Sequence, residues 1–234
     1  WTGFYVGLNA GYTWSNSSTS VASIPVFQNP GLTPFGLSQL NNITFGGSGV
    51  LGSKRNGFIG GGQIGWNWQS GAFLAGIETD IQGIASGGGG STLGSFLPTT
   101  IAGTNTLSSI TTTSKLNWLG TLRGRVGYLV TPAALLYATG GLAYGGVSST
   151  TTIFQVPQIA PIDITPGFAS VGNSSTTRLG WTVGGGLEYK FAPNWSTKLE
   201  YLYYDLGTVS YSAGVRAVAT NGGIPVWTHV STAS

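Results

Sequence analysis

The sequence contains no cysteine and no methionine, and it has one histidine, His229. The absence of cysteine excludes disulfide bonds, thiolate catalysis and thiolate metal sites. Charge is also scarce, because only 6% of the 234 residues are charged, against about 25% in ordinary soluble domains. So few charges would solubilise a globular surface poorly, and we therefore expect much of the surface never to meet water. Because the chain starts at Trp1 and has no methionine, we expect it to be a processed or truncated product.

Basic residues are too sparse to form a nucleic-acid interface. The net charge of +3 comes from nine basic and six acidic residues, and the only adjacent basic pair is Lys54-Arg55. Binding to a phosphate backbone requires a concentrated basic patch. We therefore expect no nucleic-acid partner.

Long apolar runs are missing as well. The nearest approach, residues 134–147, is broken by glycine pairs, whereas a membrane-spanning helix needs about 20 mostly apolar residues. A chain that crosses a membrane without helices must form a closed β-barrel, because lipid offers no water to unpaired backbone groups.

What the sequence does contain is strand-like alternation of apolar and polar residues. In residues 4–14, for example, Phe4, Val6 and Leu8 share one face of a strand. Strands of about 9–11 residues are long enough to cross a bilayer when tilted, and aromatics near their ends are typical of membrane barrels. A soluble β-sandwich would also alternate, and the facing of one segment, 134–147, stays open. We predict antiparallel, neighbour-paired strands at 4–14, 57–69, 73–85, 116–130, 134–147, 179–192 and 195–207.

The connections between these segments distinguish a barrel from a sandwich. Short turns near residues 71, 132 and 193 alternate with long connections rich in Ser, Thr, Gly and Asn. This order is typical of short periplasmic turns and long outer loops, whereas a Greek-key sandwich has no reason to alternate strictly. We therefore predict one all-β membrane domain over 1–234, with outer loops at 15–56, 85–115, 148–178 and 208–228.

Charged residues recur on the polar faces of the predicted strands. Arg123 and Arg125 lie two residues apart and therefore point to the same side of a strand. An eight-stranded barrel is barely wide enough for side chains to fill its interior. We predict an ion-pair plug in the lumen, with the arginines facing Glu78 and Asp80 on the adjacent strand. Its eight members are Glu78, Asp80, Arg123, Arg125, Glu188, Lys190, Lys198 and Glu200.

Tryptophans gather near the ends of the predicted strands. Such positions favour anchors at the membrane interface over a platform for binding sugars. The predicted interface residues are Trp14, Trp66, Trp68, Trp118, Trp181 and Trp195.

The seven segments together resemble a known family. WTGFYVGLNAGY, GQIGWNWQ, GIETDIQG, WLGTLRGRVGY, LLYATGGLAYG, GWTVGGGLEYKF and KLEYLYYDLG are similar to segments of the 25- and 31-kilodalton outer membrane immunogenic proteins of alphaproteobacteria. The resemblance implies an eight-stranded antiparallel up-and-down transmembrane β-barrel of the bacterial outer membrane, related to the transmembrane domain of outer membrane protein A. That family closes with a strand ending in an aromatic residue, whereas this chain stops at Ser234. We therefore expect the last strand to be missing, or to be supplied in part by residues 209–218 or the tail.

Catalysis has little support in the sequence. His229 and Ser231 would share one face of a strand but have no acidic neighbour in sequence, and Glu78 with Asp80 is better explained by salt bridges than by acid–base chemistry. We expect no enzyme, cofactor or metal site. Three functions remain: a structural surface barrel that supports the envelope, which we favour, a small porin-like channel, and a loop-mediated ligand or haem receptor. The expected partners are outer-membrane lipid and lipopolysaccharide, with copies of the chain or another envelope protein as further possibilities.

Overall fold

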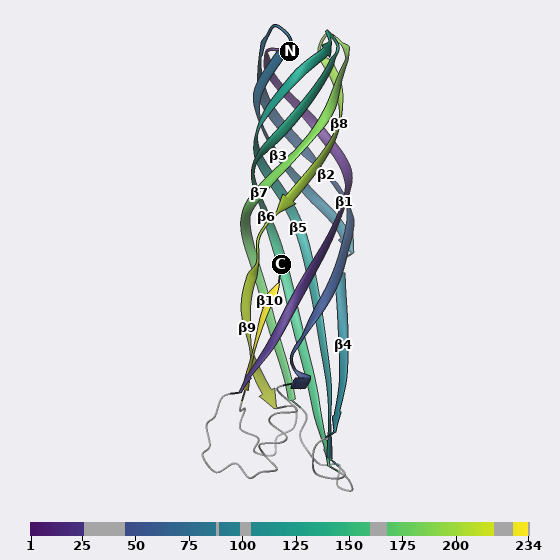
Figure 1. Ribbon diagram of the computed structural model, residues 1–234, viewed down its shortest axis with the longest axis vertical. Coiled ribbons are helices and arrows are strands. Elements are labelled where there is room, and N and C mark those ends of the chain that lie inside the picture. Colours follow the sequence, from purple (N-terminus) through teal and green to yellow (C-terminus); the bar gives the residue numbers. More distant parts are fainter. Residues whose placement is uncertain (26–44, 88, 99–103, 160–167, 218–226, 234) are drawn as a thin grey trace.

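A computed structural model describes residues 1–25, 45–87, 89–98, 104–159, 168–217 and 227–233. The described chain is almost entirely antiparallel β-structure, drawn out along one axis (Figure 1). Among the residues described, no helix is long and apolar enough to cross a membrane. The strands are β1 (Gly3–Pro25), β2 (Gly49–Ser70), β3 (Phe73–Gly87), β4 (Gly89–Pro98), β5 (Thr104–Thr131), β6 (Ala134–Ile159), β7 (Phe168–Ala192), β8 (Trp195–Asp205), β9 (Val209–Ala217) and β10 (Trp227–Ala233).

Tight turns join neighbouring strands at one end of the molecule, which we call the turn end. Gly71 and Ala72 separate β2 from β3, and Gly71 has φ of 61°, a conformation that glycine adopts without steric cost. The β5–β6 and β7–β8 turns contain Pro132 and Pro193, where a missing N–H does no harm. These three turns confirm the predicted ones, and the N-terminus lies beside them (Figure 1). The opposite end is called the loop end.

The predicted strands are all present, but most of them are longer than the sequence indicated. β5 begins at Thr104 rather than near 116, and β6 continues to Ile159 rather than stopping at 147. Large parts of the predicted loops 15–56, 85–115, 148–178 and 208–228 are therefore strand, whereas 26–44, 99–103, 160–167 and 218–226 lie outside the described residues. The reason is that Ser and Thr pair well across strands while leaving both faces polar, as where Thr111, Thr112 and Thr113 oppose Thr152, Thr151 and Thr150. Such segments lack the alternation that marked the other strands.

The strands pair in the order β1–β2–β3–β5–β6–β7–β8 at the turn end. At the loop end, β10 pairs with the last residues of β1, from Thr19 to Pro25, and β9 pairs with β10 and with β7. The tail and the segment after β8 thus supply short strands, as one of the expectations had it. The sheet is not closed, because residues 3–18 of β1 have no ladder partner on the side that faces β8 among the described residues.

Apolar side chains cover the outside of the turn-end half. Phe4, Leu8 and Leu199 are exposed at 83%, 92% and 81%, and alternate residues of the same strands point inward. Aromatic pairs mark the loop-end border of this apolar band: Tyr12–Phe58, Trp14–Tyr201, Trp118–Tyr144 and Trp181–Tyr203. Toward the loop end the outward residues become Ser, Thr, Asn and Gly. One apolar band on a polar-lined sheet is the arrangement of a membrane barrel.

A β-bulge changes which residues of β5 face inward. The register with β6 shifts between Leu116 and Trp118, so Asn117 is exposed and bonds to Ser148 Oγ instead of sharing the face of Arg123. Leu116, expected on the outward apolar face, lines the interior. In the segment 134–147, whose facing the sequence left open, odd-numbered residues such as Leu135 and Tyr137 are buried, while Leu136 is exposed.

Candidate functional site

Arg123 lies at the centre of the lumen of the turn-end half. It is 1% exposed, and its Nη2 donates to Glu78 Oε1 at 2.6 Å and to Asp80 Oδ2 at 2.8 Å, both on the paired strand β3. Its Nη1 donates to Glu200 Oε1 on β8 at 2.8 Å. One guanidinium therefore joins three carboxylates from two strands, and β8 pairs with neither β3 nor β5.

A second set of contacts surrounds Arg125. Its Nη2 donates to Glu188 Oε2 at 2.7 Å, its Nη1 donates to Tyr5 Oη at 3.1 Å, and its guanidinium lies 4.2 Å from the ring centroid of Tyr137. Tyr5 Oη in turn donates to Glu78 Oε2 at 2.6 Å. The tyrosines link the two arginines into one network and supply ring faces that attract a cation.

Lys198 brings the opposite wall into this network. Its Nζ donates to both oxygens of Glu78, at 2.8 and 2.9 Å, and lies 3.7 Å from Glu200 Oε2. Seven of the eight residues named from the sequence therefore meet in the lumen, whereas Lys190 lies apart, with Nζ 5.8 Å from the ring centroid of Trp1 at the turn end.

The pairing inside the network differs from the expected neighbour pairing. Glu188 lies opposite Lys198 in the β7–β8 ladder, yet Glu188 binds Arg125 and Lys198 binds Glu78. Arg125 was expected to face the acids of β3, but its closest carboxylate is on β7, and Glu78 Oε2 is 3.8 Å away. The reason is the narrow lumen, in which long side chains reach across as easily as along the wall. Tyr5 and Tyr137 were missed, because nothing in their local sequence distinguishes an inward tyrosine from a membrane-facing one.

An apolar cluster fills the interior near the loop end. Val21, Leu51, Ile110 and Ile153 come from β1, β2, β5 and β6, and each is at most 2% exposed. They share the inward faces of their strands with small hydroxyl residues such as Ser108 and Thr151. The interior therefore has an ionic constriction in the turn-end half and an apolar one in the loop-end half.

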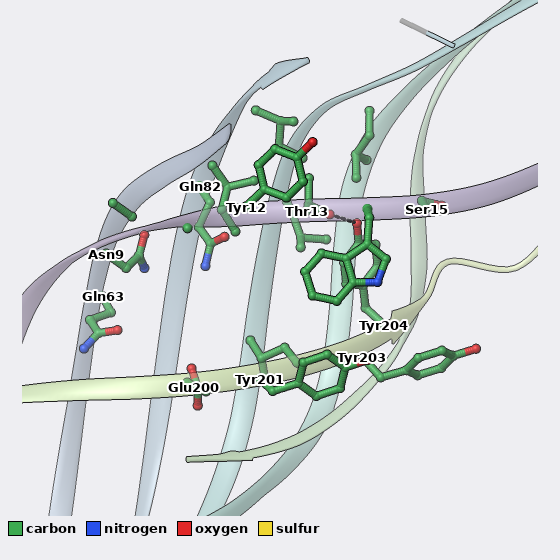
Figure 2. A pocket seen from close by; sticks show the side chains of 18 of the residues that line it. Asn9, Tyr12, Thr13, Ser15, Gln63, Gln82, Glu200, Tyr201, Tyr203 and Tyr204 are labelled. Carbon is green, nitrogen blue, oxygen red and sulfur yellow. Dashed lines mark hydrogen bonds between the residues drawn. The ribbon is translucent and has the colours of Figure 1, made fainter. Parts of the chain in front are cut away.

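A cavity of about 1400 Å³ lies beside the ionic network and opens between β1 and β8 (Figure 2). Asn9 and Gln63 line it on one side, while Glu200 and Tyr204 line it on the β8 side (Figure 2). Thr13 and Tyr204 form a hydrogen bond of 2.8 Å between their hydroxyls, and this bond bridges the two facing strand edges (Figure 2).

Two arginines line the loop-end part of this cavity. Arg55 on β2 lies three residues beyond Phe58, and Arg178 on β7 precedes Trp181 by three residues, so both lie on the loop-end side of the aromatic border. Arg55 Nη1 donates to Ser114 Oγ at 3.3 Å, and Arg178 Nη1 donates to Gly207 O at 2.7 Å. Burial lowers the pKa of both guanidinium groups from the ordinary value, and the positive charge of Arg55 lowers the pKa of Arg178 further. The sequence reasoning did not select either residue.

The tryptophans named from the sequence lie on the outer surface near the borders of the apolar band. Five of the six are at least 38% exposed, namely Trp14, Trp66, Trp68, Trp181 and Trp195, and Trp118 is partly exposed. A membrane-interface role for them stays a prediction. Within the described ranges, no group of three His, Asp or Glu side chains is placed to bind a metal ion. The side chain of His229 lies outside the described residues.

Comparison with known proteins agrees with this architecture. Residues 1–233 match the model of the outer membrane protein β-barrel domain. The chain is 38% identical over 208 residues to the 31 kDa outer-membrane immunogenic protein of Brucella melitensis biotype 1, covering 88% of this chain and 72% of that protein. It is 31% identical over 191 residues to the 22 kDa outer membrane protein of Rhizobium leguminosarum bv. viciae, covering 76% and 71%. A 25 kDa outer-membrane immunogenic protein of Brucella abortus biovar 1 is 25% identical over 212 residues, covering 90% and 68%.

The names of these relatives describe outer-membrane proteins and no enzyme. The resemblance seen in the strand segments is thereby confirmed, and the apolar band of the barrel wall meets the lipid of that membrane. The chain belongs to the outer membrane protein β-barrel family, and its location is the bacterial outer membrane.

Proposed function

We propose that this protein is a non-catalytic structural barrel whose lumen does not conduct ions, and that it supports the envelope and presents its loop end to the outside. The observation that carries the proposal is the burial of Arg123 among three carboxylates in the lumen. An ion moving along the lumen would have to separate these charges from their partners. Breaking a buried ion pair costs about 3–5 kcal/mol, so the network acts as a plug.

The apolar cluster near the loop end supports the same conclusion. Val21, Leu51, Ile110 and Ile153 fill the interior with side chains that cannot replace the hydration shell of an ion. A permeating ion would therefore meet two obstacles of different chemistry. Both would have to open together for steady conduction.

The orientation in the membrane follows from the two unlike ends. Short turns are typical of the periplasmic end of such barrels, and long connections of the outer end. The strands continue beyond the aromatic border toward the loop end with outward hydroxyl residues, such as Ser18, Ser20 and Thr150. Hydroxyl-rich strands of this kind suit a surface surrounded by the sugars of lipopolysaccharide, which we propose as the main contact of this half.

Conductance across a planar lipid bilayer tests the proposal. The wild-type protein should give no steady channel current, because its lumen is plugged. Arg123→Leu combined with Arg125→Leu removes the cations that hold the carboxylates together and should produce current steps. Lys54→Leu combined with Lys115→Leu removes the same charge from exposed positions and should remain silent. A stable open state of the wild-type protein would instead favour a small porin.

A further inference from the structure

The loop-end part of the cavity contains positive charge that the ionic network does not balance. Arg55 and Arg178 both line it, and each guanidinium donates to a neutral oxygen, Ser114 Oγ or Gly207 O. The Nε of Arg55 is buried and has no hydrogen-bond partner among the described residues. The two groups are close enough for the charge of Arg55 to act on Arg178. A pair of buried like charges is an unfavourable arrangement unless a counter-charge joins it.

The carboxylates of the chain are committed elsewhere. Four of the six acidic residues belong to the ionic network around Arg123 and Arg125. Asp205 accepts a hydrogen bond from the backbone N–H of Gly207, and Asp163 lies outside the described residues. Among the described acidic residues, none forms a salt bridge with Arg55, so its charge is left to an external partner.

The other groups that line this part of the cavity suit an oxyanion. The hydroxyls of Ser114 and Ser149 lie 3.1 Å apart beside Arg55, and the hydroxyls of Thr13 and Tyr204 face them from β1 and β8. Hydroxyls can donate to the oxygens of an anion, and a guanidinium presents a planar fork that matches a phosphate. The cavity is open between β1 and β8 at the level just beyond the aromatic border, where lipid headgroups lie.

We propose that the space between Arg55 and Arg178 is a binding site for a phosphate group. Such a group forms charge-assisted hydrogen bonds with one or both guanidinium groups and receives further bonds from the surrounding hydroxyls. Free phosphate enters from the water-filled part of the cavity. The phosphate of a lipid headgroup enters sideways through the opening between the two strand edges.

Titration calorimetry with inorganic phosphate tests the site directly, using the full chain in a phosphate-free detergent. Arg55→Gln should weaken phosphate binding about tenfold to a hundredfold, because one charge-assisted hydrogen bond is lost. Lys54→Gln is the matched control, since it removes the same charge from the neighbouring exposed position and should leave binding unchanged. Arg55→Lys keeps the charge without the fork and should weaken binding less than Arg55→Gln.

A second titration distinguishes the two sources of the phosphate group. Phosphorylated lipid A in mixed micelles is compared with dephosphorylated lipid A. Binding of inorganic phosphate identifies a site for the free anion, and binding of phosphorylated lipid A alone identifies a headgroup site, if Arg55→Gln weakens it in either case. Binding of neither ligand, or equal binding by the wild type and Arg55→Gln, overturns the proposal.

Thermal unfolding gives a readout that a purely structural role of Arg55 would not produce. The bound ligand should raise the melting temperature of the wild-type protein and of Lys54→Gln, because it binds the folded state. It should raise that of Arg55→Gln much less. An equal rise in all three proteins would contradict a site at Arg55.

Discussion

Arg123 and Glu78 lie directly opposite each other on β5 and β3, and Arg123 Nη2 approaches Glu78 Oε1 to 2.6 Å. The ladder places the two Cα atoms side by side, and the shared inward parity directs both side chains into the lumen. Lys198 reaches the same carboxylate from β8, so Glu78 is shared by two cations from different walls. The network therefore ties together parts of the barrel wall that no ladder connects.

Removing Arg123 should destabilise the folded barrel. Arg123→Leu leaves Asp80 without its cation, because Arg123 is the cation that pairs with Asp80 among the described residues. The free energy of unfolding should fall by about 3–5 kcal/mol, measured by urea titration in micelles with tryptophan fluorescence. Lys115→Leu, at an exposed position of the same strand, should change it by less than about 1 kcal/mol.

Neutralising the orphaned partner should restore part of the loss. The double variant Arg123→Leu/Asp80→Asn removes the uncompensated carboxylate, while Thr121 and Gln82 still contact the side chain at position 80. It should be more stable than Arg123→Leu alone. If the double variant were less stable, the cost would come from packing and not from charge.

The period-two pattern predicted which strands exist and where the turn end lies, because apolar residues that face lipid alternate strictly with polar ones. The same rule could not locate the loop-end limits of the strands, since outward Ser and Thr in 148–152 differ little from inward ones. It also failed at the β-bulge near Asn117, where one extra residue reverses the facing of β5. A bulge has no composition of its own that a single sequence displays.

The candidate site was predictable in its membership but not in its pairing. Inward parity selected seven residues that meet in the lumen, because charge on an otherwise apolar strand has few other places to go. Contacts across the lumen, such as Lys198 with Glu78 or Arg125 with Glu188, depend on the barrel's width and tilt. The sequence specifies neither until every strand is placed. Arg55 was overlooked because its strand begins before the apolar alternation does.

A charge on the outer wall should be costly only within the apolar band. Leu122 is 51% exposed on β5 and lies between Trp118 and Tyr128. Leu122→Arg should lower the free energy of unfolding from lipid vesicles by about 2–4 kcal/mol, because the guanidinium enters hydrocarbon. Thr150→Arg, on the exposed loop-end surface of β6, should have little effect. Equal tolerance at both positions would contradict the position of the apolar band.

Close approach of two strands makes one glycine of the lumen hard to replace. A Cβ atom at Gly141 would overlap the carbonyl oxygen of Leu122 and crowd the Cα of Arg123 on the paired strand. Gly141→Ala should therefore cost about 1–3 kcal/mol of stability, measured by urea unfolding in micelles. Gly52→Ala is the control, because nothing lies within 4 Å of its added Cβ. It should be neutral or slightly stabilising.

The orientation in the membrane can be measured by single-cysteine labelling, since the chain has no cysteine of its own. Thr150→Cys places a thiol on the exposed loop-end surface, and Asn194→Cys places one in the exposed β7–β8 turn. On intact cells a membrane-impermeant maleimide should label the first variant and spare the second, because the turn end faces the periplasm. Permeabilising the outer membrane should make Asn194→Cys reactive, which shows that its thiol is accessible. Labelling of Asn194→Cys alone on intact cells would mean that the barrel is inverted, and the loop end could then not meet lipopolysaccharide.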